Sequence, residues 1–273
     1  MVRFGVSSMF FHEYPLDEIF DFVAEAGFDA LEFWPETPDF WLRDQPVPEL
    51  QEVIAQHREI GAPAVHSPIL DLNPCSVNPS VAAISVEYAL RALELAWSIG
   101  APVFTVHPGR RTAKRVPSGP DYDRFERYIG ELRRAAAGKN LCVAMENMEP
   151  AVNSLLYTPG TVKELMERES WLSFTLDLSH ALAVSPQYAR EYLEVCHERL
   201  VNIHLSRANG GKLHLPVAGD ETVAGILSAL DDNSYDGFLI LEIEDRNFDH
   251  DLSSEEKVTI LQEELGFITK FIG

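Results

Sequence analysis

The chain has 273 residues and carries 22 Lys and Arg against 43 Asp and Glu, which gives a formal net charge of -21. This excess of acid repels phosphate backbones and disfavours nucleic acid as a partner, unless bound metals or a local basic patch override it. No apolar run approaches the roughly 18 residues that span a bilayer, and the N-terminus lacks the apolar core of a secretory signal, so we expect a cytoplasmic protein and no membrane protein. The length and the absence of low-complexity stretches favour one domain over residues 1–273.

Short apolar runs typical of strands alternate with longer helical patterns along the whole chain. The eight strand candidates are residues 3–8, 30–35, 62–69, 102–109, 141–148, 173–180, 200–207 and 237–244. Two of the helical patterns end at Gly27 and Gly100, where glycine commonly caps a helix. Eight strand-then-helix units favour an α/β fold in the form of a single-domain (β/α)8 TIM barrel over an open doubly wound sheet. No glycine-rich phosphate-binding motif follows the first strand, which argues against a Rossmann or P-loop fold.

Polar side chains lie at the C-terminal ends of six of these predicted strands. They are His66, His107, Glu146, Asp177, His180, His204, Glu242 and Glu244. In a TIM barrel those ends meet at one face, where active sites form. Each residue alone has an ordinary structural explanation, since Asp177 could cap a helix and His66 could be a hydrogen-bonded core histidine. Several converging carboxylates would repel one another and raise each other's pKa values, so we expect a bound divalent cation.

The donor types indicate which metals would suit such a site. The main ligand candidates are Glu146, Asp177, His204 and Glu242. Three carboxylates with one imidazole suit Mn(II), Mg(II) or Co(II), and also Zn(II). Adding His66 and His107 as ligands favours zinc and more than one ion.

Basic residues near the predicted site have two explanations. They could bind an anionic substrate, or they could belong to an ordinary solvent-exposed loop. The dense basic stretch is Arg110, Arg111, Lys114 and Arg115, directly after His107. With Lys212, it could hold a phosphate or carboxylate of a small molecule, but hardly a DNA duplex. From residue 220 to 264 the chain carries 14 acids against two basic residues, which would further repel DNA.

Two features of the second predicted strand and its surroundings have competing explanations. Glu32 could support a metal-ligating histidine, or it could be a simple strand-end carboxylate. The aromatic residues of the first two loops could line a binding site for a sugar, or they could simply pack over the mouth of the barrel. These aromatic residues are Phe10, Phe11, Trp34, Phe40 and Trp41.

Six segments carry a family resemblance. They are HSPILDLNP (66–74), VHPG (106–109), AMEN (144–147), LDLSHA (176–181), NIHLS (202–206) and ILEIE (240–244). They resemble the xylose-isomerase-like TIM barrels that are grouped with endonuclease IV, or AP endonuclease family 2. The resemblance spans the third to eighth predicted strands and implies a metal-dependent barrel, but two branches with different reactions remain open.

In the endonuclease IV branch, the resemblance implies three zinc ions held by nine ligands. The matching positions are His66, His107, Glu146, Asp177, His180, His204, Lys212, His214 and Glu242. Lys212 stands where that branch has an aspartate, and a protonated ammonium group cannot ligate a metal. The resemblance therefore implies that the third ion is lost and that two ions bridged by Glu146 remain, as in a zinc phosphodiesterase.

In the branch of ketose epimerases and sugar isomerases, the resemblance implies a single metal. Its ligands would be Glu146, Asp177, His204 and Glu242. Glu146 and Glu242 would also be the catalytic acid/base pair, moving a proton through a metal-stabilised enediolate, and His180 would contact the substrate. Two departures are Val152 in place of a second glutamate and Gly210 in place of an arginine, for which Arg207 is the nearest substitute.

We therefore predict a metal-dependent isomerase or epimerase of a small sugar or sugar phosphate, with zinc or manganese as the metal and magnesium or cobalt as alternatives. The predicted substrate-binding residues are His180, His214, Lys212 and Arg207. An endonuclease IV-like AP endonuclease with two metals is the alternative. A barrel that binds a ligand without catalysis is a further alternative, which the paired carboxylates disfavour.

Overall fold

Eight parallel strands close into a barrel in the computed structural model, which describes residues 1–273. The barrel strands are β1 (Arg3–Ser7), β2 (Ala30–Phe33), β3 (Ala64–His66), β4 (Val103–Val106), β5 (Cys142–Glu146), β6 (Ser173–Asp177), β7 (Leu200–Leu205) and β10 (Phe238–Leu241). Their order around the barrel is β1-β10-β7-β6-β5-β4-β3-β2. This arrangement confirms the predicted (β/α)8 TIM barrel.

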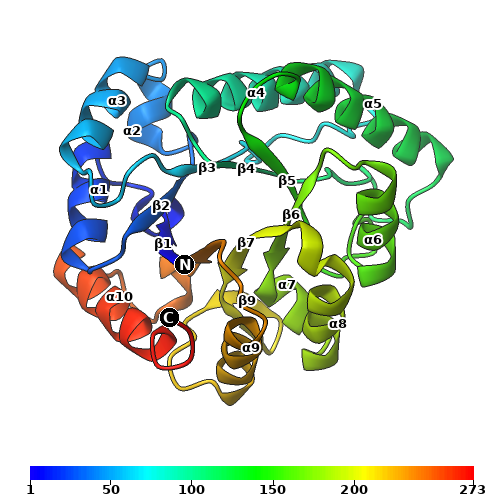
Figure 1. Ribbon diagram of the computed structural model, residues 1–273. Coiled ribbons are helices and arrows are strands. Elements are labelled where there is room, and N and C mark those ends of the chain that lie inside the picture. Colours follow the sequence, from blue (N-terminus) through cyan, green and yellow to red (C-terminus); the bar gives the residue numbers. More distant parts are fainter.

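Helices surround the barrel, as the view along its axis shows (Figure 1). They are α1 (Leu16–Glu25), α2 (Pro38–Leu42), α3 (Val47–Gln56), α4 (Pro79–Ser98), α5 (Gly119–Ala136), α6 (Pro159–Arg168), α7 (Leu178–Leu182), α8 (Pro186–Cys196), α9 (Glu221–Asp232) and α10 (Ser254–Ile268), with short 3-10 turns η1 (Ser8–Phe11), η2 (His197–Arg199) and η3 (Asp245–Asn247). Gly27 and Gly100 follow α1 and α4 with φ of 86° and 73°, which confirms the predicted glycine caps. None of these helices combines the length and the apolar composition that crossing a membrane needs.

All eight predicted strands are present, but most end earlier than the sequence indicates. The strand predicted over 62–69 is only Ala64–His66, because Pro68 lacks the N–H that a strand ladder needs. The strand predicted over 173–180 stops at Asp177, whose side chain accepts the His180 N–H and caps α7. The shortened ends leave polar side chains free of the ladder and facing the barrel mouth.

A β-hairpin that the sequence analysis missed lies after β7. Its strands are β8 (Arg207–Asn209) and β9 (Lys212–Leu215), which pair antiparallel. Gly210 and Gly211 form the turn with φ of 58° and 82°, values that favour glycine. The hairpin adds side chains from β9 to the wall of the site.

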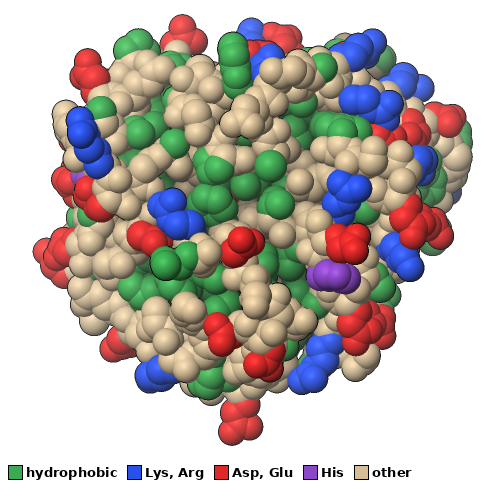
Figure 2. All heavy atoms as spheres, in the orientation of Figure 1, with side chains coloured by type: hydrophobic (Ala, Val, Ile, Leu, Met, Phe, Trp, Pro, Cys, Tyr) green, Lys and Arg blue, Asp and Glu red, His purple; other side chains and the backbone are tan.

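The barrel interior is layered. Ala64, Val103 and Ala144 form a small apolar cluster inside the barrel, separate from the main core of 59 buried residues. A buried polar layer follows, in which Glu32 Oε1 accepts hydrogen bonds from Thr105 Oγ1 at 2.8 Å and from Asn202 Nδ2 at 3.1 Å. The functional side chains lie beyond this layer. Figure 2 shows that few histidines reach the face viewed there, where hydrophobic side chains gather near the middle.

Gly237, just before β10, lies so close to the backbone of β7 that a larger residue should destabilise the protein. A Cβ added at Gly237 would lie 2.5 Å from the carbonyl oxygen of Val201, which cannot move without shifting β7. We expect Gly237→Ala to destabilise the protein by ~1–3 kcal/mol, as for other overpacked sites, measured by urea unfolding. Gly130→Ala in α5 is the matched control because nothing lies within 4 Å of the new methyl group. It should be neutral or stabilising, and equal effects of the two variants would contradict this account.

Candidate active site and metal centre

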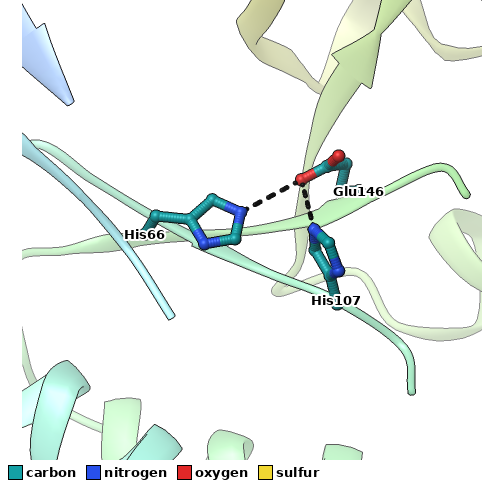
Figure 3. Close-up of side chains that lie close together, drawn as sticks. All are labelled: His66, His107 and Glu146. Atoms are coloured by element: carbon teal, nitrogen blue, oxygen red, sulfur yellow. Dashed lines mark hydrogen bonds and ion pairs between the residues drawn. The ribbon is translucent and has the colours of Figure 1, made fainter. Parts of the chain in front are cut away.

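Glu146, at the end of β5, lies at the centre of the site and is buried. Its Oε2 atom lies 3.3 Å from His66 Nε2 and 3.0 Å from His107 Nε2, and both rings point toward it (Figure 3). His204 Nδ1 lies 3.5 Å from the same oxygen. Burial alone would raise the pKa of Glu146, but His107 and His204 hold it well below its usual range. One carboxylate oxygen therefore contacts three imidazoles, which suits a ligand shared between metal positions.

Three polar atoms near Glu146 are buried without a hydrogen-bond partner. They are Asp177 Oδ2, His204 Nδ1 and Glu242 Oε2. His204 Nδ1 lies 3.1 Å from Glu242 Oε2, and Glu146, Asp177 and His204 bring ligand atoms within 4.8 Å of one another. Buried polar atoms are normally satisfied, so unsatisfied lone pairs that face one another favour a cation between them. This donor set fits a divalent metal, and its role as the ligand set stays a prediction.

His204 in β7 is held from below by Glu32. The two side chains are completely buried, and His204 Nε2 lies 2.7 Å from Glu32 Oε2. This contact favours a proton on Nε2 and orients the ring so that Nδ1 faces Glu146 and Glu242. Burial opposes the charged ring, but Glu242, Glu32 and Glu146 raise the pKa of His204 well above its ordinary value. Of the two explanations for Glu32, the geometry favours support of a metal-ligating histidine.

Asp177 uses its two oxygens for different tasks. Oδ1 accepts the His180 N–H at 2.7 Å and the Ser179 hydroxyl at 3.0 Å, which caps α7. Oδ2 makes no hydrogen bond. Burial raises the pKa of Asp177 despite the nearby His180 and His214. The capping and ligand explanations are therefore compatible.

Asn147 is a site residue that the sequence analysis overlooked, although it lies in the AMEN segment. Its side chain accepts the Asp177 N–H at 2.8 Å and donates to the Asp177 carbonyl at 3.0 Å, which fixes the end of β6. The Asn147 carbonyl accepts a hydrogen bond from His180 Nδ1 at 2.9 Å. The Nε2 atom of His180 is left available for a substrate or an ion.

His214, in β9, completes a further group of ligand atoms with Asp177 and His180. Its Nδ1 lies 3.6 Å from Glu242 Oε2. His214 has φ of 54°, in the left-handed region that non-glycine residues rarely adopt. Strained residues of this kind cluster at functional sites. A third group consists of His66, His107 and Glu146.

A cavity of about 520 Å³ opens onto these side chains. Its lining includes the predicted residues His107, Glu146, His180, Lys212, His214 and Glu242. Trp34 also lines it and stacks on His66, with ring centroids 3.6 Å apart, so the position of this one aromatic residue agrees with the alternative in which aromatic side chains line the site. Glu244 lies in the lining and pairs with Arg246. The predicted packing role fits Phe10, Phe11 and Phe40, which are fully buried.

Arg207 is not brought into this cavity. Its Nε donates to the Pro216 carbonyl at 2.5 Å, within the hairpin region. Of the basic stretch, Arg110 lines the cavity. Arg111 instead donates to the Val116 carbonyl and lies 3.6 Å from Asp121. Of the four basic residues in this stretch, only Arg110 therefore lines the cavity.

The chain is similar to proteins of known and unknown activity. It is 31% identical over 275 residues to the uncharacterized protein MJ1188 of Methanocaldococcus jannaschii, with all of both chains covered. It is 26% identical over 260 residues to 2-oxo-tetronate isomerase of Haemophilus influenzae, covering 90% of this chain and 95% of that one.

Among solved structures, a D-tagatose 3-epimerase-like protein has a TM-score of 0.76 at 24% identity, with 98% of each chain covered. At this identity the likeness shows the shared fold alone. The model of one family, the xylose isomerase-like TIM barrels, matches residues 20–271. This match and the barrel geometry show that the chain belongs to the xylose isomerase-like TIM barrel family.

Proposed function

We propose that the protein is a metal-dependent isomerase or epimerase of a small sugar-like substrate. The observation that carries the proposal is the group of unsatisfied buried atoms on Asp177, His204 and Glu242, next to Glu146. The adjoining cavity of about 520 Å³ has the size of a small-molecule site. The activity named for the Haemophilus influenzae relative, an isomerase of 2-oxo-tetronate, supports the same class of reaction.

The proposed ligands are Glu146, Asp177, His204 and Glu242, which suit zinc or manganese, with magnesium or cobalt as alternatives. A bound cation would polarise the substrate carbonyl and favour loss of a proton from the adjacent carbon. The contact of Glu32 with Nε2 aims Nδ1 of His204 at the ligand group and would leave Nδ1 as the metal-binding nitrogen. Asn147 and the α7 cap keep Asp177 Oδ2 aimed at the same place.

Glu146 and Glu242 are the proposed acid/base pair. They come from strands separated by β6 and β7, and their Oε2 atoms lie 3.5 and 3.1 Å from the same His204 nitrogen. Burial opposes ionisation of Glu242, but His204 lowers its pKa to about 2. Both carboxylates are thus held ionised, which is the state that a proton acceptor needs. His180, with Nδ1 bonded to Asn147, can present Nε2 to a substrate hydroxyl.

A second candidate is an endonuclease IV-like zinc phosphodiesterase. One observation favours it, namely that His66 and His107 both reach Glu146 Oε2 and form a separate group of ligand atoms. In that chemistry Glu146 would be a shared ligand with no proton to move. The net charge of -21 argues against a DNA substrate.

The acid/base roles predict loss of proton exchange. Glu146→Gln and Glu242→Gln should each slow exchange of substrate carbon-bound hydrogen with solvent deuterium by ~100-fold or more, because an amide cannot accept the proton. Proton NMR of ketoses and their phosphates measures the exchange, and elemental analysis separates a lost base from a lost metal. Glu167→Gln, on the exposed face of α6, should behave as wild type. Persistent exchange in both site variants would refute the roles.

Metal stoichiometry distinguishes the two candidate functions. We expect one tightly held ion per chain in protein purified without chelator and reloaded with Zn(II) or Mn(II), because the main ligand set has one group of unsatisfied atoms. His66→Ala and His107→Ala should each leave that ion bound. Two zinc ions, with one lost in each variant, would instead favour phosphodiester hydrolysis, and an abasic-site oligonucleotide would be the next substrate.

The contact of Glu32 with His204 predicts a change in metal affinity. Glu32→Gln should weaken binding ~10–100-fold, because the imidazole loses the carboxylate that orients it and increases its basicity. Titration of metal-free protein with Zn(II) or Mn(II) measures the change. Glu264→Gln is the control, since Glu264 is a buried carboxylate that accepts backbone N–H groups of Val217 and Ala218. Equal affinity of Glu32→Gln and wild type would remove this role.

A further inference from the structure

Two basic side chains line the cavity without an ion-pair partner. Arg110 lies in the loop after β4, and Lys212 begins β9 of the hairpin. The third basic residue of the lining, Arg246, is neutralised by Glu244. The chain has nearly twice as many acidic as basic residues, so most basic side chains could find an acidic partner. Two unpaired basic side chains in one cavity therefore suggest that they bind an anion.

The backbone of Arg110 is held firmly. Asn73 Nδ2 donates to the Arg110 carbonyl at 2.9 Å, and the Arg110 N–H donates to Asn73 Oδ1 at 3.1 Å. Gly109 permits this approach, because a Cβ there would lie 2.9 Å from Asn73 Oδ1. A bridge to Ser154 fixes the same residue from another loop. The guanidinium group thus extends from a fixed backbone, which reduces the entropy lost on binding an anion.

Lys212 and His214 both lie in β9, and both line the cavity. His214 faces the site, with Nδ1 3.6 Å from Glu242 Oε2. Lys212 thus borders the cavity from the hairpin, while Arg110 borders it from the loop after β4.

None of the acidic side chains that line the cavity forms an ion pair with Arg110 or Lys212. The acidic residues of the lining are Glu146, Glu149, Glu242 and Glu244. Glu146 and Glu242 contact histidines, and Glu244 pairs with Arg246. Glu149 makes no ion pair with Arg110 or Lys212 and can accept a hydrogen bond from a substrate hydroxyl.

We infer that the substrate carries a phosphate or carboxylate at the end away from the reacting carbons, and that Arg110 and Lys212 bind this group. The inference rests on the proposed function, which places the reacting carbons beside Glu146 and Glu242. An arginine can hold such an anion through two parallel hydrogen bonds, and a lysine adds a point charge. Arg111 is engaged elsewhere, and Lys114 and Arg115 do not line the cavity.

Binding of polyols that cannot react tests the inference without catalysis. The probes are D-glucitol, D-glucitol 6-phosphate and D-gluconate, titrated calorimetrically into metal-loaded protein. At least one anionic probe should bind about tenfold or more tightly than D-glucitol, since hydrogen bonds to charged groups are stronger than those between neutral groups. Arg110→Gln and Lys212→Gln should each remove most of that preference. Arg115→Gln, in the same loop but outside the lining, should preserve it. The stronger anionic probe identifies phosphate or carboxylate as the group.

Two results would overturn the inference. One is equal or undetectable binding of all three polyols to the wild type. The other is a preference that survives both Arg110→Gln and Lys212→Gln but disappears in Asp177→Asn, because the metal would then bind the anion. Selective binding as expected, with no deuterium exchange in any ketose, would support the anion site and contradict the proposed isomerase.

Discussion

The contacts of His204 with three carboxylates are the interaction on which the site depends. Glu32, Glu146 and Glu242 place oxygens 2.7, 3.5 and 3.1 Å from this one ring, and all four side chains are buried. Isolated buried carboxylates cost several kcal/mol each, so positive charge is required at this point of the barrel. A proton on the ring can supply this charge, and in the proposed site a divalent cation would take its place. The proposed metal would thus meet an electrostatic requirement that the fold itself creates.

The loops that wall the cavity are held by buried charged side chains outside the metal centre. Glu36 accepts the N–H groups of Ile69 and Leu70, and Glu264 accepts those of Val217 and Ala218. Lys257 links α10 to Asp245 at 2.8 Å while lying over aromatic rings of the first loop. These contacts fix backbone rather than side chains of the site. A site with such fixed walls loses little entropy when a small substrate binds.

Much of the site could be predicted because barrel topology brings strand ends together, whatever the details of packing. Their places at the ends of strands in a predicted barrel indicated that His66, Glu146, Asp177 and His204 would converge, and the structure brings them together. The hairpin after β7 was missed because its strands span only three and four residues, although the alternation in KLHL and Asn209 before two glycines were usable signals. Arg207 is a residue that the sequence analysis assigned to the site but that the structure places outside it. Its position after β7 suggested a substrate contact, but a local hydrogen bond to Pro216, which no periodicity reveals, holds it away.

Lys212 also bears on how many cations the barrel can hold. The group Asp177, His180 and His214 brings three ligand atoms together, and related barrels supply an aspartate beside such a group. Here an ammonium group lines the same cavity, which changes the local charge by two units relative to a carboxylate. A third divalent ion would meet repulsion where it would otherwise find a ligand. The same lysine that disfavours a metal favours an anionic substrate group, so one residue links metal number to substrate charge.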